Sequence, residues 1–137
     1  MNDSVKITIL AHNKAEKNLD PEHGFSAWIE ASGICILFDT GQGTALAGNT
    51  LNHVMAITGE TKIWTVTGGF HLTDASHSRM EETLNQLRKI SPDIIAPCHC
   101  TGEKALELIR EEFNPGFMPC HAGTVISLPR TGEPGQA

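Results

Sequence analysis

Tyrosine is absent from the 137-residue chain, and aromatic residues make up only 5% of it. A platform that stacks nucleobases or sugars needs several exposed rings, so this composition argues against one. Basic residues are also few: 10 Lys and Arg stand against 16 Asp and Glu, which gives a formal net charge of −6. The chain therefore offers no basic face for a phosphate backbone, and nucleic acid is not an expected partner.

Long hydrophobic segments are missing as well. The longest purely apolar run, Ile34 to Phe38, is far shorter than the roughly 20 residues that cross a bilayer. The first residues, Met1 to Lys6, contain no hydrophobic region of the signal-peptide kind. We therefore expect a cytoplasmic protein with no membrane association. One compact domain is expected over residues 1–128, followed by a flexible Pro- and Gly-rich tail over residues 129–137.

Hydrophobic periodicity predicts a mixed α/β domain with about seven strands and three helices. The expected strands cover residues 5–10, 25–30, 34–38, 62–67, 94–96, 117–119 and 124–128. A first helix is expected over residues 50–58. A second is capped by Ser76 or Ser78, and a third follows Thr101 as its N-cap.

Three polar residues each come directly after a predicted strand, in tight turns that contain Gly or Pro: Asp39, His71 and His99. In strand-helix units such strand ends meet at the crevice where ligands bind. Imidazole and carboxylate are donors that zinc accepts, and a catalytic metal takes three protein ligands and leaves one position for water. The alternative is that both histidines only bond to turn carbonyls.

The cysteines do not form a spread-out disulfide framework, because Cys98, Cys100 and Cys120 lie beside His99 and His121. In an extended segment, Cys98 and Cys100 would place their thiols on one side. Cys120 and His121 would have to approach them in space to complete a metal site; the alternative is thiols that pack the turn. The fourth cysteine, within the run from Ile34 to Phe38, is expected to be a small core residue.

Four segments, in order, resemble the metallo-beta-lactamase superfamily, and within it the dihydropterin ribofuranosyl-aminobenzene phosphate synthase-like branch. They are Glu22-His23-Gly24-Phe25-Ser26, Ile36-Leu37-Phe38-Asp39-Thr40-Gly41-Gln42, Gly68-Gly69-Phe70-His71-Leu72 and Pro97-Cys98-His99-Cys100-Thr101-Gly102. The resemblance implies an αββα sandwich, here truncated, with a metal centre at the edge between two sheets. In such a centre a metal-bound hydroxide attacks an ester, amide or phosphate.

The chain departs from that family between the second and third segments, where the H-x-H-x-D-H metal motif and a later ligand turn are missing. Leu46 stands where the later turn would supply a histidine. The resemblance leaves His99 as the last ligand histidine, His71 as a ligand or site-lining residue and Asp39 as a buttress. It assigns no role to Cys120 and His121. His23, in a long loop, is the candidate substrate-binding residue, with a plain loop-tip role as the alternative.

Three functions remain open on these grounds. The first is a short relative with a residual zinc, other divalent transition-metal or small-molecule site and weak or absent hydrolase activity. The second is a metal-dependent hydrolase whose site is completed by dimerisation, with Cys98, Cys100, Cys120 and His121 as additional ligands. The third is a non-catalytic interaction module. A homodimer is expected because the missing segment would leave a sheet face uncovered, and large apolar patches are rare on soluble monomers.

Overall fold

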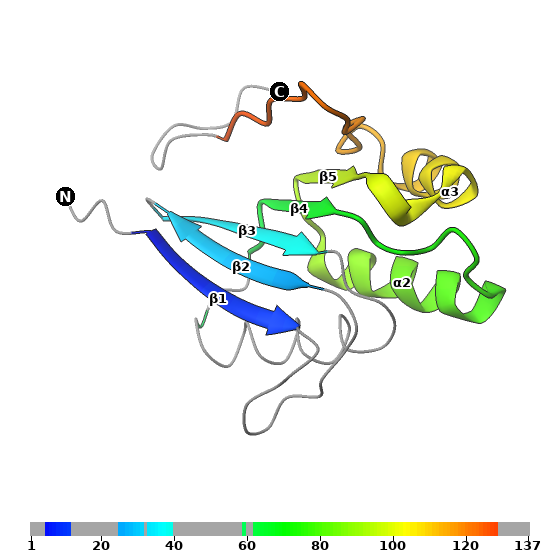
Figure 1. Ribbon diagram of the computed structural model, residues 1–137, viewed down its shortest axis with the longest axis horizontal. Helices are drawn as coiled ribbons and strands as arrows, with labels where there is room; N and C mark the ends of the chain where they lie inside the picture. The colour runs from blue at the N-terminus through cyan, green and yellow to red at the C-terminus, as the bar shows by residue number, and fades with distance from the viewer. Residues whose placement is uncertain (1–4, 12–24, 32, 40–58, 60–61, 129–137) are drawn as a thin grey trace.

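The computed structural model describes residues 5–11, 25–31, 33–39, 59 and 62–128. In this part of the chain one mixed sheet has the strand order β1-β2-β3-β4-β5, so spatial order follows chain order (Figure 1). The strands are β1 (Val5–Ala11), β2 (Ser26–Ala31), β3 (Ile34–Asp39), β4 (Thr65–Gly68) and β5 (Ile94–Pro97). The predicted mixed α/β class is confirmed.

The sheet changes from antiparallel to parallel pairing at β3. Strands β1, β2 and β3 pair antiparallel, and β2 and β3 form a hairpin whose turn contains Gly33 at φ 77°. Strands β3, β4 and β5 pair parallel. A parallel pair needs a crossover, and α2 (His77–Ile90) supplies it between β4 and β5. The carboxyl ends of β3, β4 and β5 therefore lie at one edge of the sheet.

Two α-helices and a short 3₁₀ turn follow β4. Helix α2 begins after Ser76, whose hydroxyl accepts a hydrogen bond from the Arg79 amide (3.2 Å), so one of the two predicted caps is confirmed. The 3₁₀ turn η2 (His99–Thr101) leads into α3 (Glu103–Phe113). The predicted N-cap at Thr101 is wrong, because Gly102 occupies the cap position and Thr101 lies inside η2.

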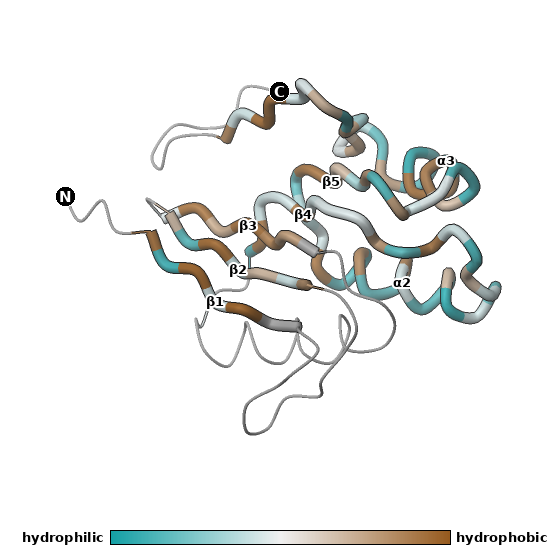
Figure 2. The backbone as a smooth tube through the Cα atoms, viewed as in Figure 1, coloured by the Kyte–Doolittle hydropathy of each residue, from teal (hydrophilic) through white to brown (hydrophobic). Residues whose placement is uncertain are grey.

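The hydrophobic core lies between one face of the sheet and the helices (Figure 2). In-register residues of four neighbouring strands supply the sheet side: Trp28, Leu37, Val66 and Ile95, each at most 1% exposed. Both helices contribute buried residues to the same cluster: Met80, Leu84, Leu87, Ile90, Ala105 and Ile109. Cys35 is 5% exposed in this cluster, as expected for a small core residue.

The opposite face of the sheet is apolar but less covered near β1. Val5, Ile7 and Ile9 alternate along this strand with exposed fractions of 61%, 60% and 44%. The register places Ile7 opposite Ile29, and Ile29 opposite Ile36, on the same face. Strand β1 is also the edge of the described sheet. An apolar strip at an open edge is a candidate contact surface.

The expectation of about seven strands is wrong in the carboxyl-terminal part. Residues 117–119 form no strand and contribute a single bridge, between Phe117 and Ile95. Residues 124–128 form no strand either: the Thr124 amide bonds back to the His121 carbonyl in a turn, and Val125 is 79% exposed. The fourth strand, predicted over residues 62–67, is observed as β4 over Thr65–Gly68, which starts three residues later and is shorter. The expected helix over residues 50–58, Leu46 and the tail over 129–137 lie outside the described residues.

None of the helices that the structure describes is long and apolar enough to span a bilayer.

Candidate functional site

The register brings the three predicted strand-end segments to the same edge. Phe38 pairs with Thr67, so Asp39 is one step beyond, level with Gly68, and Gly68 pairs with Pro97. The side chain of Asp39 lies outside what the structure describes, as does the whole of His23. The backbone thus aligns the residues that precede His71 and His99, and the assignment of Asp39 as a third ligand stays a prediction.

Backbone hydrogen bonds join the turns after β4 and β5. The Cys98 amide donates to the Gly68 carbonyl oxygen at 2.9 Å, and the Leu72 amide donates to the Cys100 carbonyl oxygen at 3.1 Å. The Thr73 hydroxyl donates to the same Cys100 carbonyl at 3.0 Å. The two turns that carry His71 and His99 are therefore one hydrogen-bonded unit rather than independent loops.

Thr101 fixes this unit from inside. Its side chain is 0% exposed, and its hydroxyl accepts a hydrogen bond from the Phe70 amide (3.2 Å) while donating to the Cys98 carbonyl (2.7 Å). One hydroxyl thus connects the turn after β4 to the turn after β5. The sequence does not reveal this role, because a threonine before a helix is typical of an N-cap.

Two glycines permit the close approach of these turns. A Cβ on Gly69 would lie 2.7 Å from the Cys100 Sγ. A Cβ on Gly102, which has φ +85°, would lie 2.7 Å from the Thr73 Cα. Real Cβ atoms do not approach backbone so closely, so side chains larger than hydrogen are excluded at Gly102 unless the turns separate.

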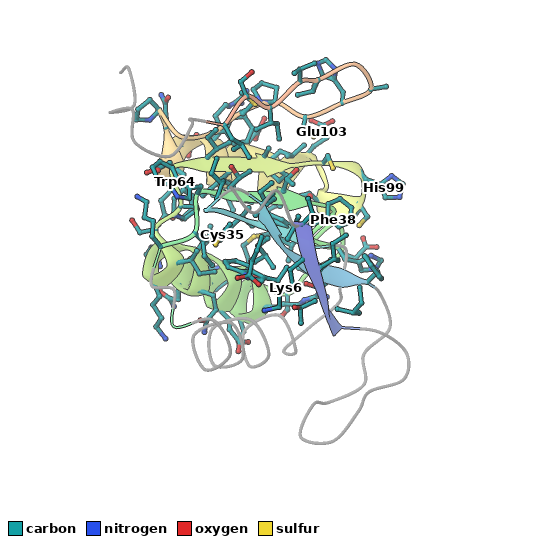
Figure 3. All side chains as sticks on the ribbon, turned by 90° about the vertical axis from the view of Figure 1, so that its left-hand side faces the viewer. Lys6, Cys35, Phe38, Trp64, His99 and Glu103 are labelled. Atoms are coloured by element: carbon teal, nitrogen blue, oxygen red, sulfur yellow. The ribbon has the colours of Figure 1, made fainter. Side chains whose placement is uncertain are left out.

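His71 and His99 share an uncommon backbone conformation. Their φ values are 53° and 52°, in the left-handed region, which costs a non-glycine residue roughly 1–2 kcal/mol. Both side chains are exposed, and Figure 3 shows His99 at the rim of the molecule. Strained non-glycine residues cluster at binding and catalytic sites. Both turns are therefore candidates for ligand contact, even though the described residues contain no group of three or more His, Cys, Asp or Glu suited to a metal ion.

Cys98 lies beside His99 and interacts with the thiols of Cys120 and Cys100. Burial raises the pKa of the Cys98 thiol above its ordinary 9.0; the charge of Cys120, a side-chain hydrogen bond with Cys120 and the charge of Cys100 raise it further. A backbone hydrogen bond at Gly68 acts in the opposite direction. The approach of Cys120 that the sequence left open is thus present in the structure. The bridge between Ile95 and Phe117 brings the segment of Cys120 beside β5, and sequence periodicity does not reveal this bridge.

Among the described residues, the hydrogen-bonding contacts of the His121 side chain are with its own turn and not with the thiols. Its side chain is exposed, and its Nδ1 lies 3.2 Å from the Ala122 carbonyl oxygen and 3.5 Å from the Thr124 hydroxyl. These partners belong to its own turn. Whether Cys98, Cys100, Cys120 or His121 ever ligates a metal stays a prediction.

A pocket of about 420 Å³ opens beside the thiols, between α3 and the segment that follows it. Its lining includes Cys120 and His121 from the segment, together with Glu103, Glu107 and Arg110 from α3. Sequence patterns predict no site at this pocket. The i to i+4 spacing of Glu103 and Glu107 indicates a shared helix face, but nothing in the sequence indicates that residues 117–121 cover it.

Comparison with known proteins supports the resemblance drawn from the four sequence segments. No protein-family profile matches the chain. The chain is 43% identical over 72 residues to a 7,8-dihydropterin-6-methyl-4-(beta-D-ribofuranosyl)-aminobenzene-5'-phosphate synthase from Methanocaldococcus jannaschii. The matched residues are 53% of this chain but 24% of that protein, so the chain covers about a quarter of the length of this curated relative.

Comparison of the fold with solved structures also indicates similarity to this superfamily. A crystal structure of a metal-dependent hydrolase of the beta-lactamase superfamily superimposes with a TM-score of 0.63 at 25% sequence identity. The superposition covers 76% of this chain and 40% of that one. Similarity to the metallo-beta-lactamase superfamily, over part of a full-length relative, is therefore confirmed in sequence and in structure.

Proposed function

We propose that this chain, similar in sequence and fold to metallo-beta-lactamase superfamily proteins, keeps a residual site for a metal ion or small ligand and has weak or no hydrolase activity alone. The observation that carries the proposal is the hydrogen-bonded unit that holds His71 and His99 at the carboxyl ends of neighbouring parallel strands. Ligands of α/β sheets bind at this edge. The missing H-x-H-x-D-H segment is the reason to expect weak or no activity.

Zinc, or another divalent transition metal, is the ion that imidazole donors favour. The described residues do not fit a three-ligand catalytic centre, because no suitable group of three is present among them. His99 is the first ligand to expect, with His71 as the second and Asp39 as a candidate third. Such a partial set holds an ion weakly and leaves its bound water without groups that orient it for attack.

Titration of chelator-stripped protein with zinc tests the site. We expect measurable binding by calorimetry that His99→Ala weakens by roughly 10–100-fold or more, since even outer partners of ligands matter that much. His77→Ala is the matched control, because His77 is an exposed histidine at the start of α2. Equal zinc affinity in wild type and His99→Ala would contradict the metal site and favour the non-catalytic interaction module.

Activity is measured on the same preparations. We expect no appreciable metal-dependent turnover of generic phosphodiesters, lactones or beta-lactams. Turnover that survives repurification and is abolished by His99→Ala would show instead that the site is catalytic.

The second candidate is a site completed by a second copy of the chain, and the apolar strip on β1 supports the association of two chains that it requires. Val5, Ile7 and Ile9 are each at least 44% exposed along an edge strand of the described sheet. An unpaired strand edge accepts another strand readily. A two-fold interface of about 800 Å² per partner would cover this strip.

Sedimentation equilibrium at micromolar concentration tests the dimer. We expect twice the monomer mass for wild type and the monomer mass for Ile7→Glu, because a carboxylate cannot be buried there without a partner. Val125→Glu is the matched control, since it places the same charge at an exposed apolar residue that is not part of β1. A folded wild-type monomer would rule out this candidate.

A further inference from the structure

The segment after α3 runs parallel to β5 and in step with it. The Ile95 amide donates to the Gly116 carbonyl oxygen and the Met118 amide donates to the Ile95 carbonyl oxygen, both at 2.9 Å. These bonds define the parallel bridge between Ile95 and Phe117. Three residues further along each segment are Cys98 and Cys120. The pairing of the backbones therefore delivers the two cysteines to the same level.

This placement suits a covalent bond between the two sulfurs. Cys98 directly follows β5 and keeps an extended backbone, with φ −150° and ψ −175°. Neighbouring strands lie about 4.8 Å apart, and a disulfide joins Cα atoms about 4.4–6.8 Å apart. The two thiols are close enough to interact electrostatically, and both cysteines are free and half-buried.

The pocket gives the two cysteines different access. Cys120 is part of its lining and Cys98 is not. Arg110 offers a guanidinium to a carboxylate, and Glu103 and Glu107 offer carboxylates to an ammonium group. A small zwitterionic molecule matches this charge pattern. A peptide-type disulfide such as oxidised glutathione carries both kinds of charged group beside its S–S bond.

The remaining cysteines are held elsewhere. Cys35 is 5% exposed in the core of the sheet. The sulfur of Cys100 packs over Gly69, and the Cys100 carbonyl accepts hydrogen bonds from Leu72 and Thr73. A Cys98–Cys100 bond would require this turn to break, so it does not compete with the Cys98–Cys120 pair.

We propose that Cys120 and Cys98 form a thiol-disulfide exchange pair that accepts a low-molecular-weight disulfide in the pocket between α3 and residues 117–121. The Cys120 thiolate attacks one sulfur of the small disulfide, breaks its S–S bond, forms a mixed disulfide and releases the first small thiol. The Cys98 thiolate then attacks the Cys120 sulfur, which forms the Cys98–Cys120 bond and releases the second small thiol. Two protein thiols are oxidised, one small disulfide is reduced, and the two thiol protons end on the released thiols.

The experiment follows the products of purified full-length chain incubated with oxidised glutathione, by intact mass and by peptide mapping. Wild type is expected to become two hydrogens lighter, with residues 98 and 120 joined. Cys98→Ser is expected to stop at one glutathionyl group, on Cys120, because no second thiol resolves it. Cys120→Ser is expected to take up glutathione at least tenfold more slowly at Cys98 than wild type forms its cross-link.

Cys100→Ser is the matched control and is expected to give the Cys98–Cys120 product at the wild-type rate. Circular dichroism of each reduced variant checks that it is folded. The peptide map of the wild-type chain tests the cross-link even if a variant fails to fold. No cross-link in wild type, a Cys98–Cys100 bond, or equal glutathione uptake on all exposed thiols of Cys98→Ser would each overturn the proposal. The proposed function is tested by zinc titration, and the exchange pair is tested by mass and peptide mapping. Either proposal can therefore fail while the other holds.

Discussion

Gly102→Ala is expected to lower the free energy of unfolding by about 4 kcal/mol. The new methyl group would lie 2.7 Å from the Thr73 Cα, and backbone at that distance cannot rotate away as a side chain would. The position also has φ 85° and ψ 148°, close to a region that glycine alone occupies without strain. Urea unfolding followed by tryptophan fluorescence measures the change, since Trp28 is buried in the core.

Gly123→Ala separates the steric contact at Gly102 from the strain of a positive φ. Gly123 has a similar φ of +91°, but a Cβ there would meet nothing within 4 Å. This variant is expected to lose only about 1–2 kcal/mol, the cost of a left-handed backbone. Equal losses in the two variants would show that strain alone governs Gly102, and that the turns after β4 and β5 are not held in close contact.

Thr101→Val is expected to cost about 3 kcal/mol, because it keeps the shape of the side chain but removes the buried hydroxyl. The Phe70 amide then loses its acceptor and the Cys98 carbonyl loses a donor. Faster hydrogen exchange at the Phe70 amide should accompany the loss of stability. The same urea unfolding series measures the free energy.

Thr101→Ser is the control, since it keeps the hydroxyl and removes one methyl group, for an expected loss of about 1 kcal/mol. If valine and serine prove equally destabilising, the hydroxyl does not connect the two turns. His71 and His99 would then be positioned by the backbone contacts of Leu72 and Cys100.

Sequence periodicity was sufficient for the elements that bury one regular face. Helix α2 shows it in Met80, Leu84 and Leu87. Strand β3 was recognised differently, from the continuous apolar run Ile34 to Phe38, in which the successive residues Ile34 and Cys35 are both buried. The same patterns failed after α3. Residues 124–128 alternate like a strand, but alternation forms no ladder without a partner, and the described chain offers them none.

The candidate site also has features that the sequence predicts and features that it does not. The strand-end positions of His71 and His99 follow from the order of strands and turns, so the sequence could predict them. The contact between Cys98 and Cys120 could not be predicted, because it depends on a single bridge between segments that are 22 residues apart. The role of Thr101 was hidden for a similar reason: its hydroxyl accepts from the Phe70 amide, which is 31 residues away in the chain, and only its second partner, the Cys98 carbonyl, is local.

The agreement between strand order and chain order has a consequence for how the chain folds. Each strand of the described sheet adds beside the one before it, so no strand has to insert between two that are already paired. The β2–β3 hairpin closes the shortest loop and is the least costly nucleus in chain entropy. Addition of β4 and β5 closes longer loops and is expected to form the slow phase. The turns that carry His71 and His99 would then become ordered last, after the sheet that supports them.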